Sequence, residues 1–265
     1  MPLSMAAASD PINPPPAPGA RTVAITGASG SLGQALLRRL HRRGDRLIAL
    51  TSSSSPLELR DAQGCPIPLR QVGWAVGQEE ELAALLAEVD LLVLNHGINV
   101  HGDRSVASVE RSLEVNALSF WRLLELFAQV ARSRPPAGRP RPEVWVNTSE
   151  AEIQVAISPL YEISKRLVGQ LLSLRAPVLE RADLESGFPG LRIRRLVLGP
   201  FRSNLNPVGG MGAAFVANEI VRQAGWNCSL IIVTPNPITY VLMPLTTLGR
   251  WLYFQALCRD APAPP

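Results

Sequence analysis

Tyr161 and Lys165 form the pair of side chains with the clearest chemistry in the sequence. They lie four residues apart in the segment YEISK, and Lys165 is the only lysine among 26 Lys and Arg residues. Ser158 and Pro159 suit the cap and first turn of a helix, which would place both side chains on one face. An ammonium near a phenol favours the phenolate, so we expect the pKa of Tyr161 below its ordinary value of about 10. The pair predicts a phenol that exchanges a proton with a substrate oxygen, although the spacing alone also fits a packed tyrosine beside a surface lysine.

A glycine-rich turn is the second candidate for chemistry. The segment TGASGSLG places Gly27, Gly30 and Gly33 after an apolar run at 22–27 and before a helical pattern at 32–43. Glycines at this point allow a tight turn and close approach of the backbone to a pyrophosphate, and the helix start offers N–H groups to it. A purely structural turn is the alternative. The context favours dinucleotide binding, and the residues between the glycines that join this predicted site are Ser29, Ser31 and Leu32.

The end of the second predicted strand bears on the choice of nucleotide. NAD sites usually place a carboxylate there for the ribose 2′-hydroxyl. Here the strand at 46–51 continues as ALTSSSSPLELR, without a carboxylate before Glu58. Thr51 and Ser52 suit a 2′-phosphate, and Arg60 is near enough in sequence to help. We therefore favour NADP(H) and keep NAD(H) as the alternative.

The order of elements predicts the fold. Short apolar runs at 22–27, 46–51, 68–76, 90–97, 143–149, 191–200 and 229–235 alternate with helical patterns at 32–43, 79–88, 105–131 and 158–175. This alternation is typical of a parallel sheet covered on both faces. We expect an α/β, single-domain Rossmann fold with a doubly wound, mostly parallel seven-stranded sheet. The predicted divisions are a disordered Pro-rich leader (1–20), a catalytic domain (21–237) and an apolar tail (238–265).

Taken together, these motifs resemble those of the short-chain dehydrogenase/reductase family over about 22–235. The resemblance includes NHG after the fourth strand, Asn116 in EVNALS, Ser149 in VNTS and LGPFRS after the sixth strand. It implies that Tyr161 is the general acid, that Ser149 orients the substrate carbonyl and that Lys165 holds a ribose. Asn116 would support a water-linked proton relay. It also implies cofactor contacts beyond the glycine turn, from Asn95, His96, Gly97, Lys165, Gly199, Pro200 and Ser203.

Within that family, two features bear on the reaction. The glycine spacing is close to the extended branch, but only 65 residues follow Pro200, so we favour the classical architecture over an epimerase or dehydratase. EVWVNTSEAE, LGPFRSNLNP and TPNPITYVLMPL resemble a cyanobacterial-type subgroup associated with sterol-desaturase-like proteins, which implies an apolar substrate. The expected function is an NAD(P)-dependent oxidoreductase that transfers hydride between NADP(H) and a carbonyl or alcohol carbon. A catalytically silent nucleotide sensor or scaffold is the alternative, and the family implies a homo-oligomer.

The loop at 150–157 and the tail complete the expectations about the substrate side. We expect Glu150 and Glu152 to be solvated, and Ile153, Val155 and Ile157 to offer an apolar substrate wall. The chain has no charged residue from 226 to 249, but prolines interrupt this run, which argues against a membrane span. The tail then predicts a lid, a dimer contact or a membrane-surface segment.

Composition excludes several other classes of protein. The net charge of +4 comes from scattered arginines, and the densest group, RSRPPAGRPR at 132–141, predicts a solvated loop, so we expect no nucleic-acid partner. The three cysteines and three histidines lack metal-binding spacing, so we expect no metal. These features predict a cytoplasmic location, with a membrane surface left open for the tail.

Overall fold

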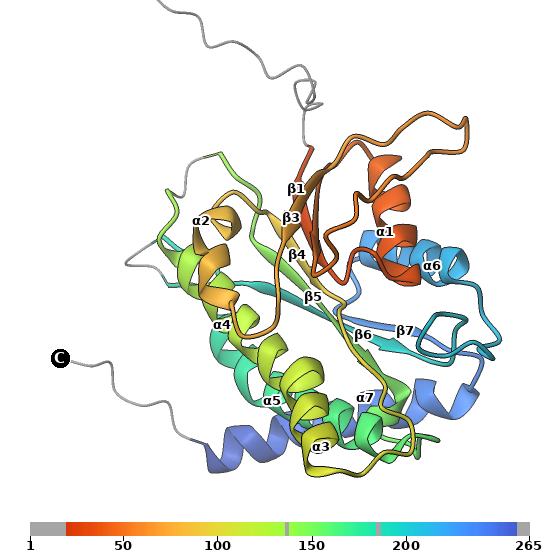
Figure 1. Cartoon of the computed structure of the whole chain (residues 1–265). Helices are drawn as coiled ribbons and strands as arrows, with labels where there is room; N and C mark the ends of the chain where they lie inside the picture. The colour runs from red at the N-terminus through yellow and green to blue at the C-terminus, as the bar shows by residue number, and fades with distance from the viewer. Residues whose placement is uncertain (1–19, 136–137, 184–186, 259–265) are drawn as a thin grey trace, which may run out of the picture.

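The computed structural model describes residues 20–135, 138–183 and 187–258. The predicted leader therefore lies outside the described residues except for its last position, and so do the final seven residues of the predicted tail. Between these limits the chain forms one parallel sheet with helices on both faces (Figure 1). The predicted α/β, doubly wound Rossmann-type architecture is confirmed.

All seven strands of the sheet pair in parallel, in the order β3-β2-β1-β4-β5-β6-β7. The order reverses direction between β1 and β4, which is the point at which ligands bind in folds of this kind. The strands are β1 (Thr22–Thr26), β2 (Arg46–Thr51), β3 (Arg70–Gly73), β4 (Leu91–Leu94), β5 (Glu143–Ser149), β6 (Arg192–Leu198) and β7 (Leu230–Val233).

Two apolar cores lie on the two faces of the sheet. Successive residues of a strand point to opposite faces, so Val23 and Ile25 of β1 join one core and Ala24 joins the other. In Figure 1, α1 (Ser31–His41) and α6 (Ala213–Gly225) cover the first face. The second face is covered by α2 (Ala83–Leu86), α4 (Ser119–Arg132) and α5 (Pro159–Leu179). The remaining elements are α3 (Val106–Leu113), the 3-10 turns η1 (Glu79–Leu82) and η3 (Glu150–Glu152), the π-helical turn η2 (Glu114–Leu118), and α7 (Pro237–Leu257).

Helix α6 was missed by the sequence analysis. Its buried residues Val216, Ala217, Ile220, Val221 and Ala224 follow helical spacing, so the signal was present. The helix supplies the crossover that a parallel connection between β6 and β7 requires.

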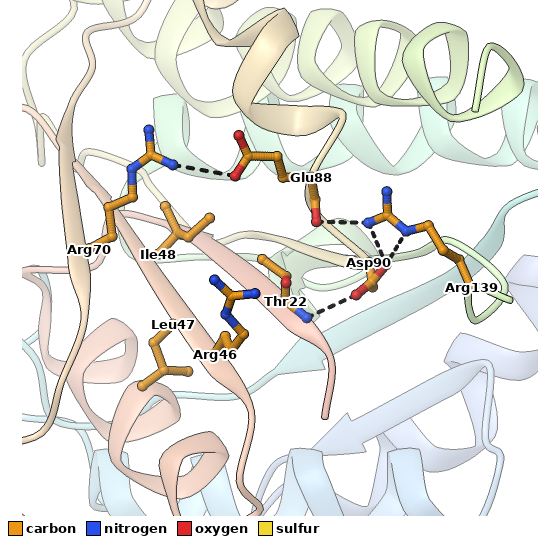
Figure 2. A pocket seen from close by; sticks show the side chains of 8 residues that line it. All are labelled: Thr22, Arg46, Leu47, Ile48, Arg70, Glu88, Asp90 and Arg139. Carbon is orange, nitrogen blue, oxygen red and sulfur yellow. Dashed lines mark hydrogen bonds and ion pairs between the residues drawn. The ribbon is translucent and has the colours of Figure 1, made fainter. Parts of the chain in front are cut away.

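After α4 ends at Arg132, the described residues up to Arg141 form a mostly exposed loop, as predicted, and two arginines of this loop bind at the amino edge of the sheet. The Arg139 guanidinium pairs with Asp90 at 2.8 Å and donates to backbone carbonyls, and Arg141 donates to the Leu191 carbonyl at 2.7 Å. The guanidinium groups thus donate hydrogen bonds to backbone carbonyls that precede β4 and β6. Arg139 also lines a charged hollow of about 570 Å³ at this edge (Figure 2).

Candidate active site

The predicted site residues gather where β1, β4, β5 and β6 end and where α1 and α5 begin. This edge of the sheet is opposite to the charged hollow of Figure 2, whose lining residues start the strands. Ligands of doubly wound folds bind outside the carboxyl ends of the strands. The carboxyl edge of the sheet is therefore the candidate site, although the charged hollow lies at the other edge.

Two glycines of the turn after β1 are required by close packing. Gly27 has a φ of +62°, and a Cβ there would lie 2.8 Å from the Cα of His96. A Cβ on Gly33 would lie 2.4 Å from the Gly27 carbonyl oxygen. The turn thus fits tightly against the end of β4, where a side chain at either position would force the backbone apart.

The start of α1 fits the phosphates of a dinucleotide. Gly30 caps this helix without a side-chain hydrogen bond, and the first turn of α1 contains no acidic residue. The backbone N–H groups of Ser31, Leu32 and Gly33 therefore donate to no capping side chain, and no acidic residue of the first turn lies beside them. Together with the glycine turn, this arrangement suits an anionic ligand.

The end of β2 lies beside the same turn. Thr51 is buried and its hydroxyl donates to the Ser29 hydroxyl at 3.1 Å, while Ser52 is exposed. The two predicted elements of the nucleotide site are thus in direct contact. Arg60 instead donates to the Gly64 carbonyl at 2.8 Å in its own loop, and its part in binding a phosphate stays a prediction.

The NHG segment after β4 is joined to β1 through Thr26. The Thr26 hydroxyl oxygen accepts the backbone N–H of Asn95 at 2.9 Å and lies 2.8 Å from Nδ1 of His96. Asn95 also accepts a hydrogen bond from the Asn147 side chain at 2.9 Å. Gly97 continues the segment, and a Cβ there would lie 3.2 Å from the Asn116 side chain. These contacts fix the backbone next to the glycine turn, where the cofactor contacts are expected.

The imidazole of His96 has a structural role that the sequence analysis missed, since His96 was predicted only as a cofactor contact. It is buried between Thr26 and the Ser119 hydroxyl, which lies 2.7 Å from Nε2, and it packs against Trp74 and Phe120. The Ser119 hydroxyl donates to the Val115 carbonyl, so it accepts from the ring. Burial and the nearby Lys165 ammonium lower the pKa of His96 to about 3.

This lowered pKa predicts an acid-sensitive fold. The folded state favours the neutral ring, so the stabilisation is complete above the ordinary pKa of 6.5 and is lost as the pH falls toward about 3. Between pH 7 and pH 5, His96 should remove about 2 kcal/mol from the free energy of unfolding. His96→Gln should flatten this part of the profile in urea denaturation, whereas His41→Gln at the end of α1 should keep it. Equal slopes in all three proteins would contradict the assignment.

Ser149 and Tyr161 meet at the crevice. Ser149 ends β5, and its hydroxyl accepts the Ala151 N–H at 3.2 Å and donates to the Leu198 carbonyl at 3.3 Å. Tyr161 lies in the first turn of α5 and is partly buried. Burial raises the pKa of Tyr161, and a hydrogen bond with the Ser149 side chain lowers it by a smaller amount.

The expected fall in the pKa of Tyr161 is therefore wrong for the chain without ligand. The Lys165 ammonium donates to the Asn147 carbonyl at 3.0 Å and lies 5.6 Å from the centre of the Tyr161 ring. Burial lowers the pKa of Lys165 itself to about 8. The ammonium is thus bound to a carbonyl and lies beside the ring, and burial decides the direction of the pKa shift of the tyrosine.

Helix α5 starts as predicted, with one difference at its cap. Ser158 occupies the cap position, but its hydroxyl donates to the His101 carbonyl at 2.9 Å and does not cap the helix. Pro159 occupies the first turn as expected. The hydroxyl therefore joins the helix start to the loop after β4, across the site.

Asn116 lies in the π-helical turn η2 and supports the site from behind. Its side chain accepts the Ile98 N–H at 2.8 Å and donates to the Ile98 carbonyl at 3.0 Å and to the Ser164 hydroxyl at 3.0 Å. Asn116 therefore joins the loop after β4 to Ser164 of α5, the residue that precedes Lys165. Its part in a proton relay stays a prediction.

The segment after β6 closes the crevice on the side of β7. A Cβ on Gly199 would lie 2.2 Å from the Thr234 hydroxyl oxygen, so this position requires glycine. After Pro200 the chain folds into a turn in which Ser203 exchanges backbone hydrogen bonds with Asn206 at 3.0 and 3.1 Å. The contact of Ser203 with a nicotinamide amide stays a prediction.

Glu152 is buried, so the prediction of a solvated carboxylate was wrong. The side chain is 0% exposed, and it pairs with Arg195 of β6 at 2.5 Å and with Arg250 of α7. Gly169 of α5 makes room for it, because a Cβ there would lie 2.0 Å from the Glu152 carboxylate. Glu150 is also bound, since its carboxylate accepts the hydroxyls of Thr234 and Thr239.

The three residues predicted to form an apolar substrate wall lie in different environments. Ile153 packs against the small core formed by Val197, Ile232 and Met243. Val155 and Ile157 are 90% and 102% exposed, so they line no wall in this structure. The described residues also contain no cluster of His, Cys, Asp and Glu that could hold a metal ion.

Comparisons with known proteins agree with the fold. Residues 23–152 match the model of the "NAD dependent epimerase/dehydratase family". The chain resembles two solved structures: a short chain dehydrogenase from Burkholderia cenocepacia J2315 in complex with NADP (15% identity, TM-score 0.68, 91% of this chain and 98% of that one), and a short-chain dehydrogenase from Sphingobium yanoikuyae in complex with NADPH (17% identity, TM-score 0.65, 92% and 98%). At these identities the structures establish the fold.

A curated relative is similar in sequence as well. The chain is 45% identical over 242 residues to the monoglucosyldiacylglycerol epimerase of Synechocystis sp.. The match covers 91% of this chain and 56% of the relative, so the chain spans little more than half the length of that protein.

Proposed function

We propose that the chain carries the dinucleotide-dependent site of a short-chain dehydrogenase/reductase-like oxidoreductase that acts on a secondary alcohol of a glycolipid headgroup. One observation carries the proposal: Tyr161, Ser149 and Lys165 come together at the carboxyl edge of the sheet, beside the glycine turn. A scaffold that only binds nucleotide has no need for a phenol, a hydroxyl and an ammonium in this arrangement. Such a silent protein remains the outcome if no substrate turns over.

The side chains supply the proton chemistry of such a reaction. Bound nicotinamide would accept and return the hydride. Tyr161 exchanges the proton with the substrate oxygen, and Ser149 turns its hydroxyl from the Leu198 carbonyl to the same oxygen. Lys165, whose pKa is about 8, remains largely protonated at neutral pH and stabilises the phenolate as it forms.

We propose epimerisation as the net reaction. Loss of a hydride from the carbinol carbon and of the proton from its hydroxyl would give a ketone. Return of the hydride to the opposite face of that carbon, and of the proton to the oxygen, would invert the carbon without net consumption of the cofactor. The similarity to a monoglucosyldiacylglycerol epimerase supports this reaction and a sugar on diacylglycerol as the substrate class. Net reduction of a carbonyl is the second candidate, supported by the arrangement of Tyr161, Ser149 and Lys165.

NADP(H) is our preferred cofactor, with NAD(H) as the alternative. The segment from Thr51 to Pro56 at the end of β2 carries hydroxyl groups and no carboxylate, which removes the usual partner of an unmodified ribose. The NADP and NADPH complexes of the similar structures agree with this preference, whereas the description of the matching family names NAD.

The test is a reaction of the purified chain with monoglucosyldiacylglycerol in micelles, with NADP, with NAD and without nucleotide. We expect inversion at one sugar carbon, and only in the reactions that contain a dinucleotide. NMR of the released headgroup measures the inversion. Net formation of a ketone or reduced nucleotide would favour the oxidoreductase alternative. Dinucleotide binding without turnover of this lipid or of a panel of carbonyl compounds would favour the silent scaffold.

A further inference from the structure

Helix α7 exposes an apolar face beside the candidate site. Thr239 and Met243 point into the protein and are buried, and Arg250 is held by Glu152. The opposite side of the helix has residues spaced by three or four positions, which places them in one row. This row, the α7 stripe, consists of Ile238, Val241, Leu245, Leu248 and Leu252, each between 53 and 61% exposed.

The α7 stripe lies close to the crevice. Gln154 donates to the Thr239 hydroxyl at 2.7 Å, and Asn236, which caps α7, donates to Gln154 at 2.7 Å. These bonds fix the loop of the fully exposed Val155 and Ile157 against the start of the helix. Figure 1 shows α7 running along the end of the molecule near the start of α5 and the end of β7. The apolar surface therefore adjoins the place where a substrate would enter.

We infer that the α7 stripe, together with Val155 and Ile157, rests on the surface of a lipid bilayer. Interfaces between proteins carry about one hydrogen bond per 100–200 Å² and a polar rim. The stripe offers only aliphatic side chains, and the one charged residue of α7 is turned away to Glu152. An aliphatic row without hydrogen-bonding groups fits acyl chains better than a second protein.

Two aromatic residues support this occupant. Trp251 and Tyr253 precede and follow Leu252, so they flank the stripe on its two sides, and both are about half exposed. Trp and Tyr are enriched at the level of lipid headgroups, where an apolar ring can keep a polar tip in water. Separately, no helix of the described ranges has the length and apolar character needed to cross a bilayer.

This inference deepens the proposed function, since it says where the substrate lies. A diacylglycerol substrate keeps its acyl chains in the bilayer and offers its sugar at the surface. A stripe resting on that surface would bring the crevice at the carboxyl edge to the height of the headgroup. The site would then act on the lipid without extracting it.

Flotation of the full chain with phosphatidylcholine vesicles tests the inference. This zwitterionic lipid isolates the apolar contribution from the net charge of +4. We expect the wild-type chain to float with the vesicles, and Leu245→Glu with Leu248→Glu to lower the bound fraction by about tenfold. Trp226→Glu is the control. This exposed residue lies between the end of α6 and the start of β7, at the amino edge of the sheet, so its substitution should leave vesicle binding unchanged.

Three results would overturn the inference. They are absence of the wild-type chain from the vesicle fraction, unchanged binding of the double variant, and a wild-type dimer that the double variant converts to monomers without any vesicle binding. Circular dichroism and dinucleotide titration confirm that the double variant is folded. Turnover of a water-soluble glucoside separates the two proposals. If the wild-type chain turns over the glucoside but does not bind vesicles, only the membrane-surface inference is wrong. If the wild-type chain binds vesicles and the double variant does not, but neither turns over the glucoside, only the proposed function is wrong.

Discussion

Replacing Tyr161 with Phe should lower turnover by about 10²–10⁴-fold, the usual contribution of a general acid or base. The ring and its packing over Lys165 remain, and only the hydroxyl that meets Ser149 is removed. Dinucleotide affinity should therefore stay close to that of the wild-type chain. The measurement combines steady-state turnover of the glycolipid with fluorescence titration of NADPH.

The matched control for this variant is Tyr240→Phe. The Tyr240 hydroxyl donates to the carbonyls of Ile232 and Thr234 at 3.3–3.4 Å, at the start of α7 and away from Ser149. Its loss should cost about 1 kcal/mol of stability and leave turnover unchanged. Equal turnover by Tyr161→Phe and wild type would remove the phenol from the mechanism, and equal losses in both variants would indicate a general structural effect.

Replacing Glu152 with Ala should be the most destabilising single change. It leaves Arg195 and Arg250 without their carboxylate in a buried setting, and loss of one partner of a buried ion pair costs about 3–5 kcal/mol. Burial lowers the pKa of Arg195, and the Glu152 carboxylate opposes this shift. The measurement is the free energy of unfolding from urea denaturation monitored by circular dichroism.

An exposed ion pair gives the control for Glu152. Glu88 and Arg70 meet at 3.4 Å (Figure 2). More than half of each side chain is exposed to solvent. Glu88→Ala should change the free energy of unfolding by less than about 1 kcal/mol. A loss at Glu152 no larger than the loss at Glu88 would show that the buried cluster does not hold α7 to the body of the protein.

The features predicted from the sequence are those specified by nearby residues. Gly27, Gly30 and Gly33 determine one turn, and Tyr161 and Lys165 lie one turn apart on a single helix. Their chemistry follows from spacing because the elements that position them are continuous in sequence. The strand pattern likewise predicted the fold class, since alternating strands and helices leave few arrangements of a parallel sheet.

Apart from helix α6, the features that were missed depend on contacts between distant segments. Glu152 lies 43 residues from Arg195 and 98 residues from Arg250, so no local pattern pairs them. The direction of the pKa shift of Tyr161 was wrong because it depends on burial, and four-residue spacing on a helix says nothing about burial. The side chain of His96 was overlooked for the same reason, since its partners come from β1 and α4.

Deuterium transfer in a single turnover tests the site most directly. The wild-type chain with NADP bound is mixed with a glycolipid that carries deuterium on the reacting carbinol carbon. The reaction is quenched, and the deuterium in the nucleotide is measured by mass spectrometry. We predict that deuterium appears transiently on the nucleotide. In Tyr161→Phe the rate of this transfer should be lower than in the wild-type chain by a factor of about 10² or more. Inverted product formed without deuterium ever reaching the nucleotide, or transfer at the wild-type rate in Tyr161→Phe, would contradict a hydride-transfer site built around this tyrosine.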